Sequence, residues 1–401
     1  MTTGLQDQLV ALRLVRRHAI LAGQSSHDAP VFFSSDNIKL ILMIDLRHNY
    51  PVLDTQATIL HHYMQRTADA VDQPLLALPP WHGASKDCII AAHWLKATAG
   101  QKTLLCSSGN HAVLIIALAL KLPGKTVVIE DFTYSAFKML AAMLGIRLIP
   151  CPTDEHGIIP DALAELCRRH TVAALFVQPT IHNPTCLTMP LDRRQQLVEV
   201  AGSHDIAIIE DDAYRFLHES PPARFADLAP SHTLHIASLS KAFSPALKVS
   251  YLLVAEQFHQ CVEEAIRLTS SGTSSVLACL ASMMIEDGTI DEVIRLKRWE
   301  AGRRQAVMRD VLNGLNWQSH PTSFHVWLRL PQSCSADAVR DVLGKDGVDI
   351  SSGNEFSAPG VDGNGAIRIS LGAESKLERL TAGLSAIRNL VSAPGARAAS
   401  A

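Results

Sequence analysis

Residues 234–248 read Leu-His-Ile-Ala-Ser-Leu-Ser-Lys-Ala-Phe-Ser-Pro-Ala-Leu-Lys, and we interpret the rest of the chain around this stretch. A short apolar run that ends at Ser238 predicts a strand, and a small polar turn after it holds Lys241. Pro245 stops a helix from continuing smoothly, because proline lacks an N–H donor and restricts the residue before it. A lysine held near a strand end can lose solvation, and its lowered pKa makes it a nucleophile toward carbonyls. A solvated surface lysine is the ordinary alternative.

The composition is that of a globular protein with a large core. The chain has 401 residues, which favours two closely linked domains, and 47% of them are hydrophobic against 19% charged. A net charge of -3 provides no basic surface, so nucleic acid is not an expected partner. The eight cysteines are scattered without paired spacing, which predicts free thiols in a reducing compartment.

Metal and membrane binding are not expected either. Histidine is abundant, at 18 residues, but His61 and His62 are adjacent and no helical histidine pair with a carboxylate partner is apparent. No apolar run reaches the ~18 residues that a membrane span needs. The first twenty residues lack the features of a secretory signal and only weakly resemble a transit peptide. We therefore predict a cytoplasmic protein without a metal site.

The order of predicted elements is that of an α/β layer fold. From about residue 101 onward, buried strands alternate with helices, which is typical of a mostly parallel sheet flanked by helices, and a smaller α/β unit follows. The expected divisions are an N-terminal arm (1–43), a segment for the small domain and dimer contacts (44–100), a large domain (101–305), a small domain (306–391) and a disordered tail (392–401).

Polar turns follow the predicted strands that begin near residues 103, 126, 172, 206 and 234. Ligands of α/β sheets bind at such strand ends. Ser108, Gly109 and Asn110 precede a predicted helix, whose free N–H groups and dipole favour a phosphate; an ordinary helix cap is the alternative. Asp211 is suited to keep the ring nitrogen of an aromatic cofactor protonated. Aspartates at strand ends, however, often only form turns.

Three further residues fit an aromatic aldehyde cofactor. Tyr214 and Asn183 could face a phenolic oxygen, although Asn183 precedes Pro184 and is by default a turn residue. Tyr134 offers a ring for stacking, with a core tyrosine as the alternative.

In order and spacing, these motifs resemble the aspartate aminotransferase-like, fold type I family of enzymes that use pyridoxal 5′-phosphate. The resemblance covers about residues 45–390 and depends mainly on Asn183-Pro-Thr, Asp211-Asp-Ala-Tyr214, Ser238-Leu-Ser-Lys241 and Arg368 in Ile-Arg-Ile-Ser. Within the family, Glu210-Asp-Asp and residues 324–331 look most like the aminotransferase domain of MocR-type regulators. With one predicted helix, the N-terminal arm is too short for the helix-turn-helix of those regulators.

The resemblance implies a role for each matched residue. Lys241 forms a Schiff base with the cofactor and then moves the substrate's proton, while Asp211 pairs with the pyridinium nitrogen. Tyr214 and Asn183 hold the phenolic oxygen, and Tyr134 stacks on the ring. The residues expected around the phosphate are Ser108, Gly109, Asn110, Ser238 and Lys248. Arg368, with Asn183 beside it, binds the substrate carboxylate. Family members form active sites across a dimer interface, so a homodimer is expected.

The chain departs from the family pattern at several positions. Lys248 occupies the position of a usual arginine, and Ala246 that of a usual glycine. The family tends to place a tyrosine in the loop before the second helix, where it reaches the partner subunit's phosphate. Residues 78–83 contain none, so Trp81 or His82 could substitute.

Three functions remain open from the sequence. The first is an aminotransferase that moves an amino group between an L-amino acid and a 2-oxo acid. The second keeps the cofactor but catalyses elimination, cyclisation or oxidation of an amino acid in a specialised biosynthetic pathway, which the departures near Lys248 and Trp81 would allow. The third is a non-catalytic regulator domain, against which the weak charge argues. No second arginine matches a site for a distal carboxylate, so an acidic substrate side chain is not favoured.

Overall fold

The computed structural model describes residues 43–51 and 53–393. The predicted N-terminal arm and C-terminal tail lie almost entirely outside these residues. The described residues from 44 to 393 form one compact unit, which contains two main sheets.

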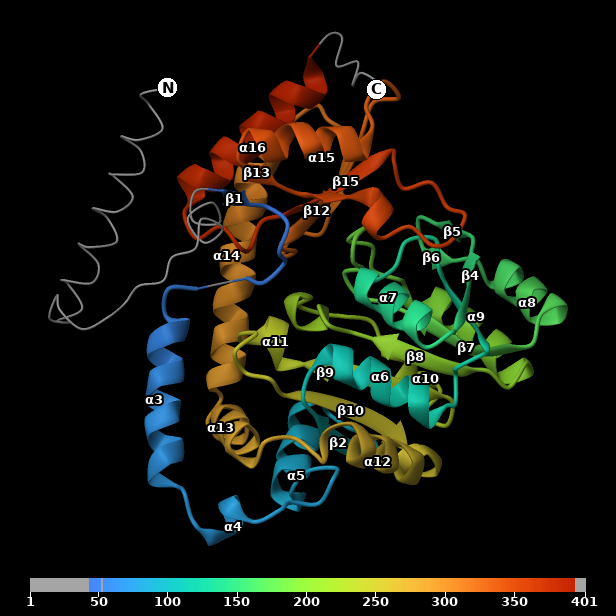
Figure 1. The fold of residues 1–401 in the computed structure, drawn as a ribbon, viewed down its shortest axis with the longest axis vertical. Helices are drawn as coiled ribbons and strands as arrows, with labels where there is room; N and C mark the ends of the chain where they lie inside the picture. Colours follow the sequence, from blue (N-terminus) through green and yellow to red (C-terminus); the bar gives the residue numbers. More distant parts are fainter. Residues whose placement is uncertain (1–42, 52, 394–401) are drawn as a thin grey trace, which may run out of the picture. The chain divides into compact units, whose positions relative to one another are not determined.

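A seven-stranded sheet forms the larger layer (Figure 1), in the order β2-β10-β9-β8-β7-β3-β4. Its strands are β2 (Gln101–Cys106), β3 (Thr126–Glu130), β4 (Arg147–Cys151), β7 (Val172–Val177), β8 (Ala207–Asp211), β9 (Thr233–Ser238) and β10 (Ser250–Ala255). Strands β4, β3, β7, β8 and β9 are parallel, while β10 runs antiparallel to β9 and β2. The predicted mostly parallel sheet is therefore confirmed. A short hairpin of β5 (Thr153–Asp154) and β6 (Gly157–Ile158) follows β4.

Helices cover both faces of this sheet, which explains why central strands such as β3 and β7 are runs of mostly apolar residues. Successive side chains point to opposite faces, so Ile209 joins the core under α6 (Gly109–Ala119), α7 (Ser135–Met143) and α12 (Glu256–Ser270). Ile208 instead joins the core under α8 (Pro160–Arg169), α9 (Leu191–Ser203) and α10 (Phe225–Leu228).

A third core lies around the predicted N-terminal segment. It joins α3 (Gln56–Asp69) and α5 (Ser85–Trp94) to α11 (Leu239–Ala242), α13 (Ser275–Glu286) and the first turns of α14 (Thr289–Val311). The short α4 (Gln73–Leu76) connects α3 to the loop before α5.

The smaller sheet is antiparallel, in the order β11-β12-β15-β14. Its strands are β11 (Trp317–Ser319), β12 (His325–Arg329), β14 (Ser351–Ser352) and β15 (Ala366–Ser370). Its core includes α15 (Ala336–Lys345), α16 (Leu377–Ser392) and the end of α14. β1 (Ile44–Asp45) pairs with β13 (Val348–Asp349), so the start of the described chain joins this core through Leu46. The predicted boundary at 305/306 falls inside α14 and stays a prediction.

Residues 348–352 contribute two short strands, because residues 348–349 pair with β1 and residues 351–352 pair with β15. One predicted element differs from the structure. The turn expected at Lys241 is the short helix α11, which Ser238 caps by accepting a hydrogen bond from the Ser240 N–H. Two 3₁₀ turns, η1 (Arg215–Leu217) and η2 (Gly353–Glu355), complete the described elements. No helix among the described residues is long and apolar enough to cross a membrane.

Candidate active site

The carboxyl ends of β2, β7, β8 and β9 meet around a cavity of about 100 Å³. Parallel strands bring the residues that follow them to one edge of a sheet, so the predicted polar turns converge there. Every predicted cofactor residue lines this cavity: Ser108, Gly109, Asn110, Tyr134, Asn183, Asp211, Tyr214, Ser238, Lys241 and Lys248. Arg368 reaches the same place from β15 of the smaller sheet through its contact with Asn183.

Lys241 points its amine among aromatic rings and a backbone carbonyl. Its Nζ donates to the Asn49 carbonyl oxygen at 2.7 Å and lies 3.4 Å from the centre of the Tyr50 ring. Burial, and then the positive charge of Arg368, lower the pKa of Lys241 to about 7, although Asp211 opposes this shift. A large share of the amine is therefore neutral near pH 7, which is the form that attacks a carbonyl.

Asp211 ends β8 and is buried at the floor of the cavity. One of its carboxylate oxygens accepts from the Gln178 side chain at 2.9 Å. Burial, and then the negative charge of Asp212, raise the pKa of Asp211 to about 6. Above that pH the ionised carboxylate can pair with a protonated ring nitrogen.

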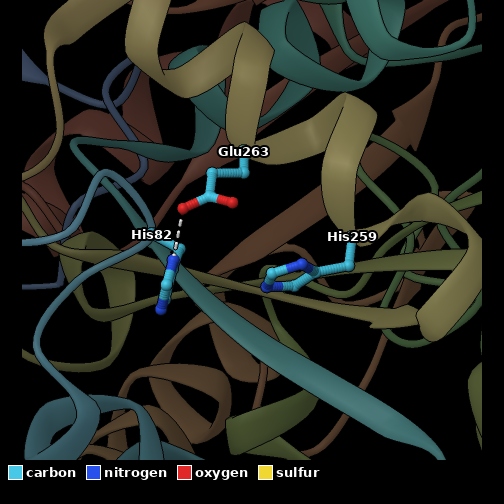
Figure 2. A group of neighbouring side chains, drawn as sticks. All are labelled: His82, His259 and Glu263. Carbon is cyan, nitrogen blue, oxygen red and sulfur yellow. Dashed lines mark hydrogen bonds and ion pairs between the residues drawn. The ribbon is translucent and has the colours of Figure 1, made fainter.

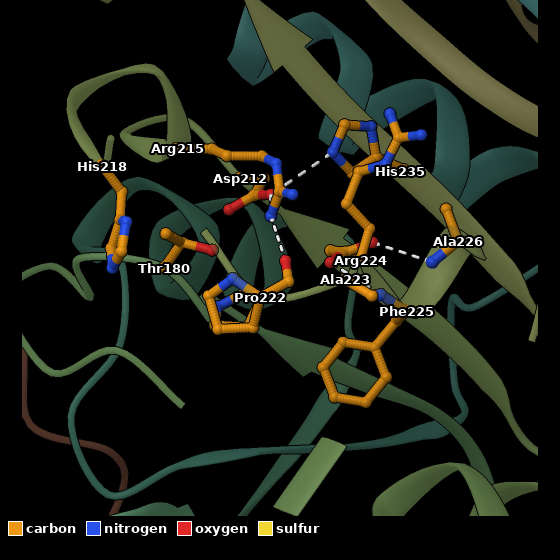
Figure 3. A network of polar contacts seen from close by, with 12 residues as sticks. Thr180, Asp212, Arg215, His218, Pro222, Ala223, Arg224, Phe225, Ala226 and His235 are labelled. Atoms are coloured by element: carbon orange, nitrogen blue, oxygen red, sulfur yellow. Dashed lines mark hydrogen bonds and ion pairs between the residues drawn. The ribbon is translucent and has the colours of Figure 1, made fainter. Parts of the chain in front are cut away.

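Asp212, the residue after β8, belongs to a polar network with Arg215 and His235 (Figure 3) and does not line the cavity. It lies 3.6 Å from His235 and 3.4 Å from Arg215 in ion-pair geometry. Although burial opposes ionisation, His235 and Arg215 lower the pKa of Asp212 below its ordinary value. The negative charge of Asp212 thus adds to the effect of burial in raising the Asp211 pKa.

The predicted pair for a phenolic oxygen is assembled from distant segments. The Tyr214 hydroxyl accepts from the Asn49 side chain at 2.9 Å, and burial raises the pKa of Tyr214, so its hydroxyl keeps its proton. Asn183 accepts from Arg368 through Oδ1, which leaves its NH₂ group to donate into the cavity. The loop that holds Asn183 includes Ile181 at φ 51, a conformation that is strained for a β-branched residue.

Arg368 is buried and carries a guanidinium next to the cavity. It donates to Asn183 Oδ1 at 2.9 Å and to Ser351 Oγ at 3.3 Å, and it also donates to the Arg47 carbonyl. Its guanidinium carbon lies 4.7 Å from the centre of the Phe356 ring. The Nε atom is buried without a hydrogen-bond partner in the described chain, so this cation is poised for an anionic ligand.

The opposite end of the cavity holds the residues predicted to surround a phosphate. Ser108 caps α6 and its Oγ accepts from the His111 N–H at 3.1 Å, while Gly109 and Asn110 form the first helical turn. Free N–H groups and the helix dipole favour an anion at this end. Ser238 and the exposed Lys248 line the same cavity and supply a hydroxyl and a positive charge.

Four polar or aromatic residues that line the cavity or reach it were given no role from the sequence: Asn49, Tyr50, Gln178 and Ser240. Gln178 had a signal that could have revealed it, because it follows the buried strand β7 directly, and Ser240 lies within the Ser238-Leu-Ser-Lys241 motif. Asn49 lies 192 residues from Lys241 in the chain, so no local pattern connects them. Tyr134, predicted to stack on a ring, donates its hydroxyl to Asn110 at 2.9 Å.

Trp81 and His82, which could substitute for the family tyrosine, do not line this cavity. Trp81 packs against the core beneath α6 and α12, and His82 hydrogen-bonds Glu263 at 2.6 Å. A role toward a partner subunit stays a prediction.

Solved structures of aminotransferases share this fold. The kynurenine aminotransferase of Pyrococcus horikoshii has a TM-score of 0.81 at 20% identity and covers 93% of this chain and 99% of its own. LysN, an α-aminoadipate aminotransferase of Thermus thermophilus, has a TM-score of 0.79 at 19% identity, covering 92% and 97%. The family model for class I and II aminotransferases matches residues 42–387. The chain belongs to this aminotransferase family.

Curated relatives include regulators as well as enzymes. An uncharacterised helix-turn-helix regulator of Bacillus subtilis, YdeF, is 26% identical over 288 residues, which is 72% of this chain and 62% of the relative. A 2-aminoadipate transaminase of Thermus thermophilus is 24% identical over 305 residues, covering 74% and 76%. The chain spans 62% and 54% of the length of the first two relatives, both regulators of this kind.

Proposed function

We propose that the chain is a pyridoxal 5′-phosphate-dependent aminotransferase that moves an amino group between an L-amino acid and a 2-oxo acid. One observation carries the proposal: Lys241, with its pKa lowered to about 7, and the buried Asp211 line one cavity whose other end is a helix N-terminus. Membership of the aminotransferase family and relatives such as the 2-aminoadipate transaminase support the same reaction.

The residues present fit the cofactor from end to end. Ser108, Gly109, Asn110, Ser238 and Lys248 would hold its phosphate, and Asp211 would pair with its ring nitrogen. Tyr214 and the Asn183 amide would donate to its phenolic oxygen. The bound cofactor supplies an aldehyde that condenses with amines and a ring that draws electrons from the substrate's α-carbon.

The chain's own residues would position the substrate and move its proton. Arg368 would bind the α-carboxylate, which places the α-carbon near Lys241. Lys241 Nζ, once neutral, could accept the proton from the substrate's α-carbon and return it to the cofactor's former aldehyde carbon. The rings of Tyr50 and Tyr214 lie 3.4 Å and 5.8 Å from this amine and would limit water around it.

The test follows cofactor absorbance during a single half-reaction. The purified protein should show the band of lysine-bound cofactor, and the correct amino donor should convert it to the amine form. Lys241→Ala should abolish this conversion, while Lys345→Ala, on the exposed side of α15, should not change it. The absence of conversion with every amino acid would contradict the proposal. Ammonia release or oxygen uptake without a 2-oxo acid would favour the elimination or oxidation alternative.

We also infer a cytoplasmic homodimer acting in amino acid metabolism and biosynthesis. All eight cysteines are free, as expected in a reducing compartment. Large apolar side chains are exposed in the segment expected to make dimer contacts, including Leu76, Leu78 and Ile89 at 67%, 71% and 60%. Such surfaces commonly mark protein contacts.

A further inference from the structure

Three potential metal ligands meet where the loop before α5 contacts α12 (Figure 2). His82 comes from this loop, and His259 and Glu263 come from α12. None of the three lines the active-site cavity. The sequence predicted no metal site because no helical histidine pair with a carboxylate partner is apparent in it, whereas this group combines a helical histidine and glutamate with a histidine from a distant loop.

The positions of these side chains follow from the backbone. Residues four apart on a helix lie on one face, so His259 and Glu263 project the same way. The loop is held in register because the His82 carbonyl accepts from the Leu105 N–H of β2 at 2.9 Å. Gly272, at φ +101, allows the chain after α12 to approach the Trp81 carbonyl; an added Cβ would lie 3.3 Å from it. The loop and α12 are therefore in close contact without any ion.

The side-chain geometry suits a small divalent ion. His82 Nδ1 lies 2.6 Å from Glu263 Oε1, and the two imidazole rings are 5.4 Å apart, centre to centre. One ligand atom from each residue can be chosen so that all lie within 4.8 Å of one another. Zinc binds nitrogen and oxygen at about 2.0–2.2 Å, which places neighbouring ligand atoms of a tetrahedral site about 3.3 Å apart. The 2.6 Å contact and the 4.8 Å limit lie on either side of that spacing.

We propose that His82, His259 and Glu263 form a Zn²⁺ site that links the loop at 78–84 to α12, with water as the fourth ligand. Two neutral imidazoles and one carboxylate are ligands that zinc prefers. The His82 and Glu263 side chains are 26% and 28% exposed, so an ion has access from solvent. A simple ion pair would need only His82 and Glu263 and would not explain the edge-on approach of His259.

Zinc bound at this site would stabilise the fold. Farther along α12, Thr269 hydrogen-bonds His111 at 2.8 Å, and His111 belongs to the first turn of α6 at the phosphate end of the cavity. An ion that fixes α12 to the loop would thus support the frame of the active site without contacting its ligands. This inference does not depend on the proposed transamination.

The experiment is a zinc titration of the full chain with its cofactor, after treatment with a chelator. Isothermal calorimetry should give one Zn²⁺ per chain, and thermal melting should shift upward with the metal. His259→Phe keeps an aromatic ring without a ligating nitrogen, and Glu263→Gln keeps a hydrogen-bonding oxygen without the charge. Each should raise the zinc Kd at least about tenfold, since even loss of a second-layer partner costs that much. Glu264→Gln, one residue on and exposed, should bind as the unchanged protein does.

Cobalt substitution separates this site from adventitious binding to the free thiols. Co²⁺ at a nitrogen and oxygen site should give visible bands without sulfur charge-transfer absorption, and both variants should lose those bands while their circular dichroism is unchanged. Zinc binding that is absent, or equal in the unchanged protein and in both variants, would overturn the proposal.

Discussion

At the residue scale, Lys241 depends on a second lysine beneath it. Lys297, on α14, is fully buried, and its Nζ donates to the carbonyls of Lys241 and Phe243 at 2.8 and 2.7 Å. Burial lowers the pKa of Lys297 to about 7, and its charge also lowers that of Lys241. Lys297 therefore fixes the backbone of α11 from below and is a positioning residue for Lys241.

Replacing Lys297 by methionine keeps the side-chain length but removes the Nζ donor from the Lys241 carbonyl, whereas the Phe243 carbonyl keeps a hydrogen bond from the Gln56 side chain. The free energy of unfolding should fall by about 1–3 kcal/mol, the typical cost of unpaired buried polar groups. Lys345→Met, on the exposed side of α15, should change it by less than about 0.5 kcal/mol. Urea unfolding with the cofactor absent measures both values, and equal stabilities would refute the role given to Lys297.

The pKa of Lys241 also predicts how its reactivity varies with pH. In the cofactor-free protein, capture of a small aldehyde by Lys241 should rise as pH passes through about 7 and then level off, because the amine is by then mostly neutral. Mass spectrometry after borohydride reduction measures the extent of labelling. A midpoint near the ordinary lysine value of about 10.4 would contradict the prediction.

The lowered pKa of Lys241 also makes the free energy of unfolding depend on pH. A depressed lysine pKa means that the unfolded chain binds this proton more tightly. The contribution of Lys241 to stability is therefore fully present above the unfolded pKa and is lost as pH falls through about 7.

At the element scale, the smaller sheet depends on a close contact between two glycines. A Cβ on Gly353, in η2, would lie 2.6 Å from the Ala366 carbonyl oxygen and closer still to that of Gly363. Both neighbours are backbone atoms, so no side-chain rotation relieves the clash. This contact packs η2 against the segment that leads into β15, the strand that carries Arg368.

Gly353→Ala should therefore destabilise the protein by about 1–3 kcal/mol, as overpacking typically does. It should also weaken substrate binding more than cofactor binding, because Arg368 moves while the phosphate end does not. Gly302→Ala is the matched control: it lies within α14 with open space around its Cβ position, and alanine should gain up to about 1 kcal/mol there. Thermal unfolding compares the two, and an unchanged Tm in Gly353→Ala would be inconsistent with this packing.

At the scale of the whole molecule, the candidate site needs residues from both sheets. Arg368 of β15 meets Asn183 after β7, and Asn49, just beyond β1, contacts both Tyr214 and Lys241. Any change in how the smaller sheet packs on the larger one would therefore alter the carboxylate site first.

The proposed homodimer gives a prediction at this scale. Sedimentation should give twice the mass of one chain, and Leu78→Asp should weaken the dimer at least about tenfold if the 44–100 segment makes the contacts, since buried unpaired charge is costly. Met143 on α7 is 83% exposed and lies outside that segment, so Met143→Asp should leave the dimer intact. A monomer at micromolar concentration would refute the dimer itself.

The sequence alone determined the strands of the large sheet, the polar turns after them and the family. Runs such as Val172–Val177 are buried on both faces, so local composition suffices to identify them, and the turn residues follow directly in the chain. The tertiary structure decided what those residues touch. It placed Asn49 and Tyr50 against Lys241, divided residues 348–352 between two sheets and brought His82 to α12, because contacts between residues far apart in the chain depend on packing and leave no local pattern.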